Sequence, residues 1–363
     1  MTEAYLAGRA LASALGPDLA TALPTLAQGG VPPVAVTLAD GSSWPCYAIA
    51  DDEPDWTTRS RRLVQQAAAD SGALAGSRAG ALFIASSSLD IGLLETSLDF
   101  ERDHQQFADT VAGWIGWRGP VYTVSTACTS GLNALLSART LVRHGVVPDA
   151  LVLGLELRNK VTVGGFGGMQ LLSAAGALPY GLQRSGLVLG EAVAALHVSA
   201  RPARWRIAGG ANVVDGRDAA GTIESAVVQM CHQALAHSAL APHDIDLLTP
   251  QAAGGVASDA TEARALNQVF DPLPPLVSFK AALGHTLGAS GVAELALLTA
   301  CLESGAWPAA RHAADPSLKA PLAKHAPSHA RHVMASILGF GGGHAAVVLE
   351  DTRAHTQADP SAP

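Results

Sequence analysis

The chain has 363 residues and a formal net charge of −8; 48% of its residues are hydrophobic, 5% are aromatic and 37 are glycine. Its length allows one large domain or two fused halves, and the composition is typical of a closely packed α/β protein. The negative charge argues against nucleic acid or an anionic membrane as a partner, and no apolar run reaches the ~18–20 residues that span a bilayer.

Cysteine usage and the first residues of the chain bear on its compartment. Cys46, Cys128, Cys231 and Cys301 form no CxxC pair, which argues against a zinc site and against a disulfide framework. The opening residues lack the basic region of a secretory signal. We therefore expect a protein of the reducing cytoplasm.

Apolar, β-branched runs alternate with helical patterns along the chain. In chain order we predict a weak strand at 5–10, helices at 19–27 and 57–69, a strand at 79–86, a helix at 97–113, a strand at 121–124, a helix at 130–142, and strands at 149–156 and 192–198. The pattern then restarts, with a strand at 203–211, a helix at 222–237, a strand at 245–249, a helix at 259–269, a strand at 276–280, a helix at 291–303, and strands at 332–338 and 345–349.

This order predicts two βα halves that pack through central helices. The strands are uninterrupted apolar runs, as expected when helices cover both faces of a sheet. We place the first half at residues 1–202 and the second at 203–350, followed by a polar, disordered tail at 351–363. No residue-level repeat is visible, so the duplication is inferred from the order of elements alone.

Four candidate functional motifs follow predicted strands: Cys128, Gln251, His285 and the glycine-rich loop 339–343. Ligands in α/β sheets bind outside the carboxyl ends of strands, so these motifs are expected to converge. Cys128 lies where a strand turns into a helix N-terminus, whose free N–H groups are expected to lower the pKa of the thiol and favour the reactive thiolate. The alternative is a buried cysteine that only fills space.

Five motifs in one order carry a family resemblance. They are Thr126-Ala-Cys-Thr-Ser-Gly131, the glycine-rich loop Gly164-Gly-Phe-Gly-Gly-Met169, Arg184-Ser-Gly-Leu-Val-Leu-Gly-Glu191, Ser278-Phe-Lys-Ala-Ala-Leu-Gly-His-Thr-Leu-Gly-Ala-Ser-Gly291 and Leu338-Gly-Phe-Gly-Gly-Gly343. From about Tyr5 to Leu349 the chain resembles a β-ketoacyl-ACP synthase of the elongating type, in the thiolase superfamily. The resemblance implies a five-layered αβαβα fold of two pseudo-duplicated βα halves that usually dimerises.

The resemblance also implies roles for single residues. Cys128 would be the nucleophile that accepts an acyl chain from a phosphopantetheine thioester, and the backbone N–H groups of Cys128 and Phe340 would form the oxyanion hole. His285 would donate a hydrogen bond to a thioester carbonyl. Lys280 and Glu191 would form a buried pair that orients the loops of the site.

Further residues are matched to substrate and carrier binding. Phe166, Phe340 and Gly341 would line and gate the acyl pocket. Arg59, Arg61 and Arg62 would contact an acidic acyl carrier protein, although an ordinary solvated helix face is an equally good interpretation of this cluster. The resemblance implies no metal and no cofactor, because the substrates are carried on the phosphopantetheine of the carrier protein. It also implies a homodimer, or a heterodimer with another ketosynthase.

One departure from the family is large. Gln251 stands where the family has the first catalytic histidine of a His-Gly-Thr-Gly-Thr motif, while Asp259 and Glu262 keep their register. Glutamine donates a hydrogen bond but does not titrate, so proton transfer, often worth ~10²–10⁴ in rate, is removed. A smaller departure places His344 after the last glycine loop, where either a site role or a structural role is possible.

Four functions therefore remain open. Decarboxylative condensation with malonyl-ACP, in fatty-acid or polyketide biosynthesis, requires that the Gln251 amide be sufficient. A thiolase-like site is disfavoured because the second thiolase cysteine is missing. A catalytically reduced partner subunit, like a chain-length factor, is disfavoured because Cys128 is retained. Simple acyl transfer or hydrolysis needs only Cys128, one histidine and the oxyanion hole.

Overall fold

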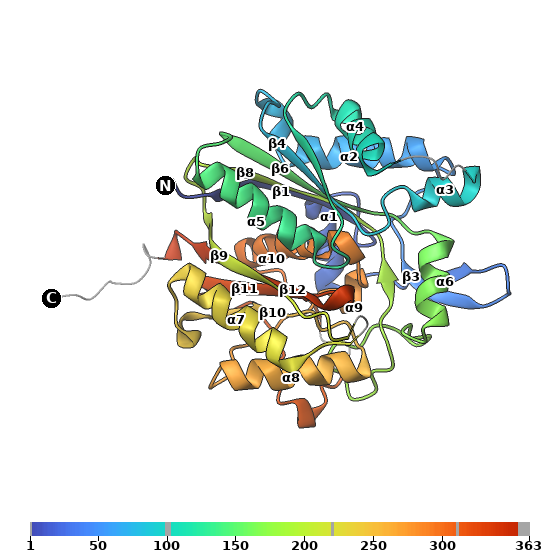
Figure 1. Cartoon of the computed structure of the whole chain (residues 1–363). Helices are drawn as coiled ribbons and strands as arrows, with labels where there is room; N and C mark the ends of the chain where they lie inside the picture. The colour runs from blue at the N-terminus through green and yellow to red at the C-terminus, as the bar shows by residue number, and fades with distance from the viewer. Residues whose placement is uncertain (1, 99–102, 219–220, 310–311, 355–363) are drawn as a thin grey trace.

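A nine-stranded mixed sheet forms the frame of the protein, in the order β10-β11-β12-β9-β1-β8-β6-β4-β5. The computed structural model describes residues 2–98, 103–218, 221–309 and 312–354 (Figure 1). The strands of this sheet are β1 (Tyr5–Ser13), β4 (Ala81–Ala85), β5 (Val121–Val124), β6 (Asp149–Glu156), β8 (Ala192–Ser199), β9 (Trp205–Val214), β10 (Leu247–Thr249), β11 (His332–Leu338) and β12 (Gly343–Asp351). A small second sheet joins β2 (Val34–Thr37), β3 (Ser43–Tyr47) and β7 (Leu189–Gly190).

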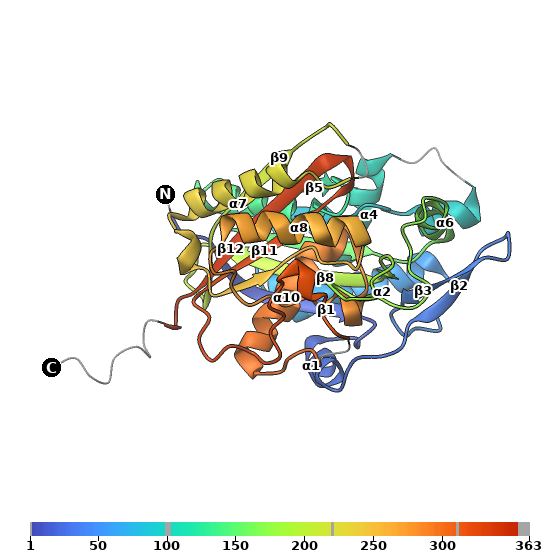
Figure 2. The ribbon, with the colours of Figure 1, turned by 90° about the horizontal axis from the view of Figure 1, so that it is seen from below.

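The helices fall into groups by their place around the large sheet. They are α1 (Leu19–Ala27), α2 (Trp56–Asp70), α3 (Ile91–Ser97), α4 (His104–Ile115), α5 (Ser130–Arg143), α6 (Lys160–Gly168), α7 (Glu224–Ser238), α8 (Val256–Val269), α9 (Lys280–Leu283) and α10 (Ser290–Ser304). Figure 1 shows α2 and α4 above the first half of the sheet, α5 and α10 in the middle, and α7 and α8 below the second half. Figure 2 shows the same layers from below, with α6, β2 and β3 at one end. The predicted five-layered thiolase-like fold is confirmed.

The two halves of the sheet repeat one pattern of strand order and direction. In the first half β1 and β8 are antiparallel, as are β8 and β6, whereas β6, β4 and β5 are parallel. In the second half β9 and β12 are antiparallel, as are β12 and β11, whereas β11 and β10 are parallel. A parallel bridge between Leu248 and Leu276 places the segment after α8 beside β10, as β5 lies beside β4. Ends of equivalent strands therefore face one site, while the division at residue 203 stays a prediction.

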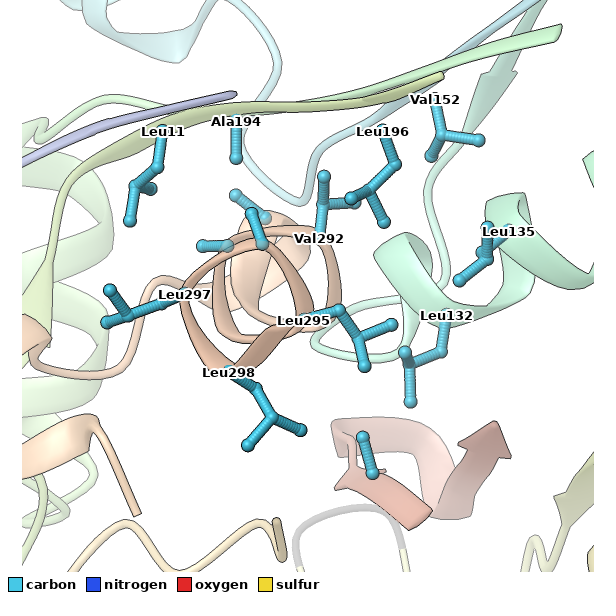
Figure 3. Close-up of a cluster of buried hydrophobic side chains, with 14 of the residues drawn as sticks. Leu11, Leu132, Leu135, Val152, Ala194, Leu196, Val292, Leu295, Leu297 and Leu298 are labelled. Atoms are coloured by element: carbon cyan, nitrogen blue, oxygen red, sulfur yellow. The ribbon is translucent and has the colours of Figure 1, made fainter. Parts of the chain in front are cut away.

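Helix α10 is the central packing element. Figure 3 shows Val292 projecting from it toward the sheet above, Leu295 toward Leu132 of α5, Leu297 to the opposite side and Leu298 away from that sheet. All four are fully buried. The expectation that no apolar run is long enough to span a bilayer needs correction, because the 18-residue stretch Leu287–Ser304 is long and apolar enough by length and composition. However, 83% of this stretch is buried inside the fold. Its hydrophobicity is thus accounted for by its place between the two halves of the sheet.

Several sequence predictions need correction. The glycine-rich motif 164–169, predicted as a loop, belongs largely to helix α6, which Asn159 caps through a hydrogen bond from the Thr162 N–H. The predicted strand at 276–280 is reduced to the bridge at Leu276, and Lys280 begins helix α9. Strands β2, β3 and β7 and helix α3 were not predicted. The predicted helix at 97–113 starts only at His104, and residues 99–102 lie outside the described part, as does most of the predicted tail.

Candidate active site

A sharp backbone turn presents Cys128 between β5 and α5. Ala127 has φ of +52°, a left-handed conformation that costs a non-glycine residue roughly 1–2 kcal/mol. Ser130 holds this turn because its hydroxyl accepts from the Thr126 N–H at 2.9 Å and donates to the Ala127 carbonyl at 2.6 Å. The Cys128 side chain is thereby directed inward, and the residue is only 3% exposed.

Side chains from both halves meet at the Cys128 sulfur. His285 Nε2 lies 3.0 Å from Cys128 Sγ, and Gln251 Nε2 lies 3.5 Å from the same imidazole nitrogen. The other ring nitrogen, Nδ1, lies 3.1 Å from the Ser290 hydroxyl. Because the Gln251 amide nitrogen can only donate, this arrangement favours a neutral imidazole with an accepting Nε2 and an Nδ1–H that donates to Ser290. Such an imidazole can accept the thiol proton.

Burial sets the protonation states of this pair. It raises the pKa of the Cys128 thiol to about 12, although hydrogen bonds from the Phe340 and Cys128 backbone N–H groups oppose the rise. The expectation that the helix N-terminus lowers this pKa is therefore wrong, because loss of water outweighs the backbone contribution. Burial, with the Lys280 charge, lowers the pKa of His285 to about 3. At neutral pH the pair rests as a thiol beside a neutral imidazole.

The loop between β11 and β12 lies against the nucleophile. A Cβ atom on Gly339 would lie 3.2 Å from Thr129 Cγ2 and 3.4 Å from the Cys128 nitrogen, so the loop packs directly against the turn that carries Cys128. Gly342 has φ of +73°, and a Cβ on it would meet the Asp215 carbonyl oxygen at 1.7 Å. Glycines thus bring the Phe340 N–H to the sulfur, where with the Cys128 N–H it can serve as an oxyanion hole.

The backbone at Gln251 is fixed by a buried carboxylate. Glu262 Oε1 accepts from the Gln251 N–H at 2.8 Å, and Glu262 Oε2 accepts from the Ala252 N–H at 2.9 Å. The Tyr180 hydroxyl donates to the same Oε2 at 2.8 Å. Burial, assisted by the charge of Asp259, raises the pKa of Glu262 to about 7. Within the described residues the buried Oε1 of Gln251 has no hydrogen-bond partner.

The predicted pairing of Lys280 with Glu191 is wrong. Lys280 Nζ donates to both carboxylate oxygens of Glu294, at 2.6 and 2.9 Å, and both residues are at most 3% exposed. The sequence analysis did not identify Glu294 as the partner of Lys280, although a lone acidic residue inside the apolar helix pattern 291–303 was a usable signal. Glu191 instead accepts from the Arg59 guanidinium and from backbone N–H groups at Ile49 and Arg158.

The arginine cluster is split by the fold. Arg59 is 7% exposed and pairs with Glu191 at 2.8 Å and with Asp51 at 3.2 Å, so its predicted carrier-binding role is corrected to an internal one. Arg61 is exposed, and the half-exposed side chain of Arg62 also pairs with Asp51. Only Arg61 and Arg62 therefore remain available to a carrier protein.

A cavity of about 310 Å³ opens beside the nucleophile. Phe166 from α6 and Phe340 meet edge to face at its wall, with ring centroids 5.3 Å apart. Its lining residues are Ser87, Ser88, Ala127, Cys128, Thr162, Gly165, Phe166, Met169, Leu287 and Phe340. Gly341, also predicted to gate the pocket, has φ of +79° beside Phe340 but is not a lining residue. The cavity is placed to receive a group attached to Cys128.

His344 lies just beyond this loop, in β12. It is 1% exposed, and burial lowers its pKa. Neither ring nitrogen has a hydrogen-bond partner among the described residues. All four cysteines are free, and the described residues contain no cluster of three or more His, Cys, Asp or Glu side chains suited to a metal ion.

Comparison with known proteins agrees with this geometry. Residues 60–202 match the family "Beta-ketoacyl synthase, N-terminal domain", and residues 206–314 match "Beta-ketoacyl synthase, C-terminal domain". The spectinabilin polyketide synthase system protein NorC of Streptomyces orinoci is 32% identical over 227 residues, which are 57% of this chain and 10% of NorC. The 3-oxoacyl-[acyl-carrier-protein] synthase 2 of Mycobacterium bovis is 30% identical over 259 residues, which are 63% of this chain and 60% of the synthase.

Solved structures extend the likeness to the whole fold. A chain from the complex of the ketosynthase ApeO with its chain length factor ApeC, from Xenorhabdus doucetiae, is 23% identical and superposes with a TM-score of 0.84, covering 97% of this chain and 98% of that chain. A β-ketoacyl synthase from Burkholderia phymatum is 21% identical, with a TM-score of 0.81 and coverage of 97% and 100%.

The two family matches together span more than two thirds of the chain and include Cys128, Gln251 and His285. The matched part spans a tenth to about three fifths of the length of curated relatives such as these. The fold, the strand-end site and both family matches agree, and the chain belongs to the β-ketoacyl synthase family of the thiolase superfamily.

Proposed function

We propose that the protein is a condensing enzyme of fatty-acid or polyketide biosynthesis. Cys128 takes an acyl chain from a carrier-protein thioester and condenses it with malonyl-ACP. The observation that carries this proposal is the 3.0 Å contact between Cys128 Sγ and His285 Nε2, beside a sulfur that the Phe340 N–H also reaches. A nucleophile, a base and an oxyanion donor are the groups that acyl transfer needs.

Acyl loading follows from these contacts. As the thiol sulfur attacks the thioester carbon, its proton passes to His285 Nε2, and the carbonyl oxygen becomes an oxyanion held by the Cys128 and Phe340 N–H groups. Collapse of this intermediate breaks the bond to the phosphopantetheine sulfur, which leaves with the proton from His285. The result is an acyl-Cys128 thioester, a free carrier thiol and a neutral imidazole.

Condensation then requires loss of carbon dioxide from the malonyl thioester. Lys280 and Glu294 hold the helix that precedes His285, and the Gln251 amide and the His285 ring face the reacting groups from the second half. For this step the imidazole takes the tautomer with the proton on Nε2, and Nδ1 accepts from the Ser290 hydroxyl. The Nε2–H and the Gln251 amide then donate to the enolate oxygen while the enolate carbon attacks the acyl-Cys128 carbonyl. A carbon–carbon bond forms, the carbon–sulfur bond breaks, and the Cys128 thiolate takes one proton from solvent.

Two partners fit this function. An acyl carrier protein would deliver both substrates, and the exposed Arg61 and Arg62 offer it positive charge near the start of α2. A second copy of this chain, or another ketosynthase, would pair along β5. This strand ends the nine-stranded sheet, and its Tyr122 is 44% exposed beside a groove that also contains Phe83 and Leu136.

The experiment is intact-protein mass spectrometry after mixing with acyl-ACP, with Cys128→Ala as the control, followed by malonyl-ACP. We expect wild-type protein to gain the acyl mass, to lose it when malonyl-ACP is added, and to release β-ketoacyl-ACP. Failure of the wild type to gain any acyl mass would contradict the proposal.

The second candidate is a catalytically reduced partner of another ketosynthase, like a chain length factor. Gln251 favours it, because an amide cannot move a proton during decarboxylation. The intact Cys128–His285 contact favours the condensing enzyme. Acylation without turnover by malonyl-ACP would favour plain acyl transfer, and activity that appears only when a second ketosynthase is added would favour the partner subunit.

A further inference from the structure

The cavity beside Cys128 carries hydroxyl groups in an otherwise apolar wall. Phe166, Met169, Leu287 and Phe340 supply carbon surface. The hydroxyl groups of the lining come from Ser87, Ser88 and Thr162. The loop that follows β4 therefore brings polar groups to a space that would otherwise suit a plain hydrocarbon chain.

Ser87 and Ser88 differ in what their hydroxyl groups contact. The Ser88 hydroxyl donates a hydrogen bond to the Glu156 carboxylate. The Ser87 hydroxyl is buried and has no hydrogen-bond partner among the described residues. A buried hydroxyl without a partner costs roughly 1–3 kcal/mol in desolvation, so a ligand that pairs with it recovers that loss. Ser87 thus belongs to the wall of the cavity that contains the nucleophile, and its hydroxyl, which no protein group uses among the described residues, reaches a ligand there by rotation about χ1.

The backbone around Ser87 is fixed before any ligand binds. Glu156 Oε2 accepts from the Ser87 N–H at 2.8 Å and from the Gly288 N–H at 3.0 Å. Glu156 Oε1 accepts from the Ser88 N–H at 3.0 Å, and the Ser86 hydroxyl accepts from the Leu89 N–H at 2.8 Å. Because the backbone of the loop is held at each of these points, only the χ1 rotation of Ser87 remains to be fixed when a ligand binds.

We infer that Ser87 recognises an oxygen on the acyl group bound to Cys128, and that the preferred acyl donors are short and carry a hydroxyl or keto oxygen beyond the thioester carbon. This inference rests on the proposed function, since it requires Cys128 to be acylated. The cavity volume of about 310 Å³ lies at the lower end of the ~300–1,000 Å³ found for small-molecule sites, which suits a short acyl group.

The test compares thioesters that differ by one oxygen. The full chain is mixed with the N-acetylcysteamine thioesters of butanoate, 3-hydroxybutanoate and 3-oxobutanoate, and the rate of mass gain at Cys128 is followed by intact-protein mass spectrometry. We expect wild-type protein to prefer one or both oxygenated groups over butanoyl by roughly threefold to tenfold, as one net hydrogen bond contributes. In Ser87→Ala this ratio falls to about one.

Thr162→Val is the matched control, because it removes the other free hydroxyl of the same cavity. The preference should persist in this variant. The unfolding midpoint of Ser87→Ala should not fall, since the removed hydroxyl has no hydrogen-bond partner among the residues that the structure describes. Equal loading rates of all three thioesters in the wild type, or a preference abolished by Thr162→Val and kept in Ser87→Ala, would overturn the inference. Absence of any mass gain would overturn the proposed function itself.

Discussion

Two equivalent strand ends, one in each half of the sheet, are fixed by the same device. After β4, the carboxylate of Glu156 accepts from the consecutive N–H groups of Ser87 and Ser88. After β10, the carboxylate of Glu262 accepts from the consecutive N–H groups of Gln251 and Ala252. We call each carboxylate with its two backbone N–H donors a clamp. In both clamps the first donor residue carries a buried oxygen, Ser87 Oγ or Gln251 Oε1, that has no hydrogen-bond partner in the described part of the chain.

The two clamps differ in the element that carries the carboxylate and in the hydrogen-bond donor that the other half of the sheet supplies to it. Glu156 ends the neighbouring strand β6 and also accepts from the Gly288 N–H of the second half. Glu262 lies in helix α8 and accepts from the Tyr180 hydroxyl of the first half. Each half thus holds one wall of the site through a contact with the other, with the acyl cavity on the Glu156 side and the imidazole and amide on the Glu262 side.

The largest expected effect comes from His285→Ala. If the second half supplies the base, Cys128 acylation slows by about 10²–10⁴. The pKa of His285, lowered to about 3, leaves the imidazole neutral throughout, so the wild-type rate stays flat between pH 5 and 8. In the variant the thiol, with its pKa raised to about 12, must ionise unaided, and the rate rises about tenfold per pH unit. Stopped acylation assays on the wild type and the variant across this pH range measure the loss of rate and the change in pH profile. Identical pH profiles for the wild type and His285→Ala would contradict the role of His285 as the base. The control is His243→Ala, which replaces an exposed histidine.

Removing the Glu156 clamp is expected to lower stability strongly. Glu156→Ala leaves three backbone N–H groups, two of them fully buried, without their acceptor, which destabilises by about 3–5 kcal/mol. Urea unfolding curves measure the free energy change. Glu224→Ala, which breaks a surface pair with Arg264, should cost no more than ~1 kcal/mol. Equal losses in the two variants would show that the clamp contributes little.

The Glu262 clamp is expected to make stability depend on pH. Its pKa is raised from 4.5 to about 7, so the folded state binds the proton more tightly than the unfolded state. The free energy of unfolding therefore falls as pH rises from about 4.5 through 7, by at most about 3 kcal/mol, and is level above that range. In Glu262→Gln this contribution disappears. Urea unfolding at pH 5 and pH 8 measures the difference; an unchanged slope in the variant would count against the assignment.

Replacing the side-chain amide of Gln251 by an imidazole should give the site a second titrating group. Gln251→His adds a second imidazole next to His285, and we expect malonyl decarboxylation to rise by about tenfold or more. Gln251→Asn, which keeps the amide but shortens the side chain, is the matched control and should not accelerate the reaction. The measurement is carbon dioxide release from malonyl-ACP. A slower Gln251→His enzyme would mean that the amide is better adapted to this site than a histidine.

The smallest effect is expected at the surface, outside both clamps. Arg61→Ala with Arg62→Ala should weaken acyl carrier protein binding only a few-fold, because exposed ion pairs contribute ~0.2–1 kcal/mol each. Titration at low and at 0.5 M salt would show the loss mainly at low salt. Arg264→Ala, exposed on α8, is the control for the loss of one positive charge away from this cluster. Loss of binding in the control instead would move the docking surface to the other half.

Element boundaries were predictable where local signals dominate. The strand bounds 121–124, 149–156 and 332–338 agree with β5, β6 and β11, because each is a short apolar run between turn residues. Helix α6 was missed, because four glycines in nine residues give it poor intrinsic helix propensity. Tertiary packing overrides that propensity. A Cβ on Gly167 would lie 2.8 Å from the indole nitrogen of Trp44, so α6 packs closely against a residue more than a hundred positions away in the sequence.

The sequence by itself determined the alternation of strands and helices, the strand-end positions of Cys128 and Gln251, and the family, whereas His285 follows helix α9 and not the predicted strand. These follow from short-range patterns of apolar, glycine and polar residues. The tertiary structure alone decided that Lys280 pairs with Glu294, that Glu191 pairs with Arg59, and that the Cys128 thiol has a raised rather than a lowered pKa. Charge partners and desolvation depend on which distant segments exclude water around a group, and that is a property of the completed fold.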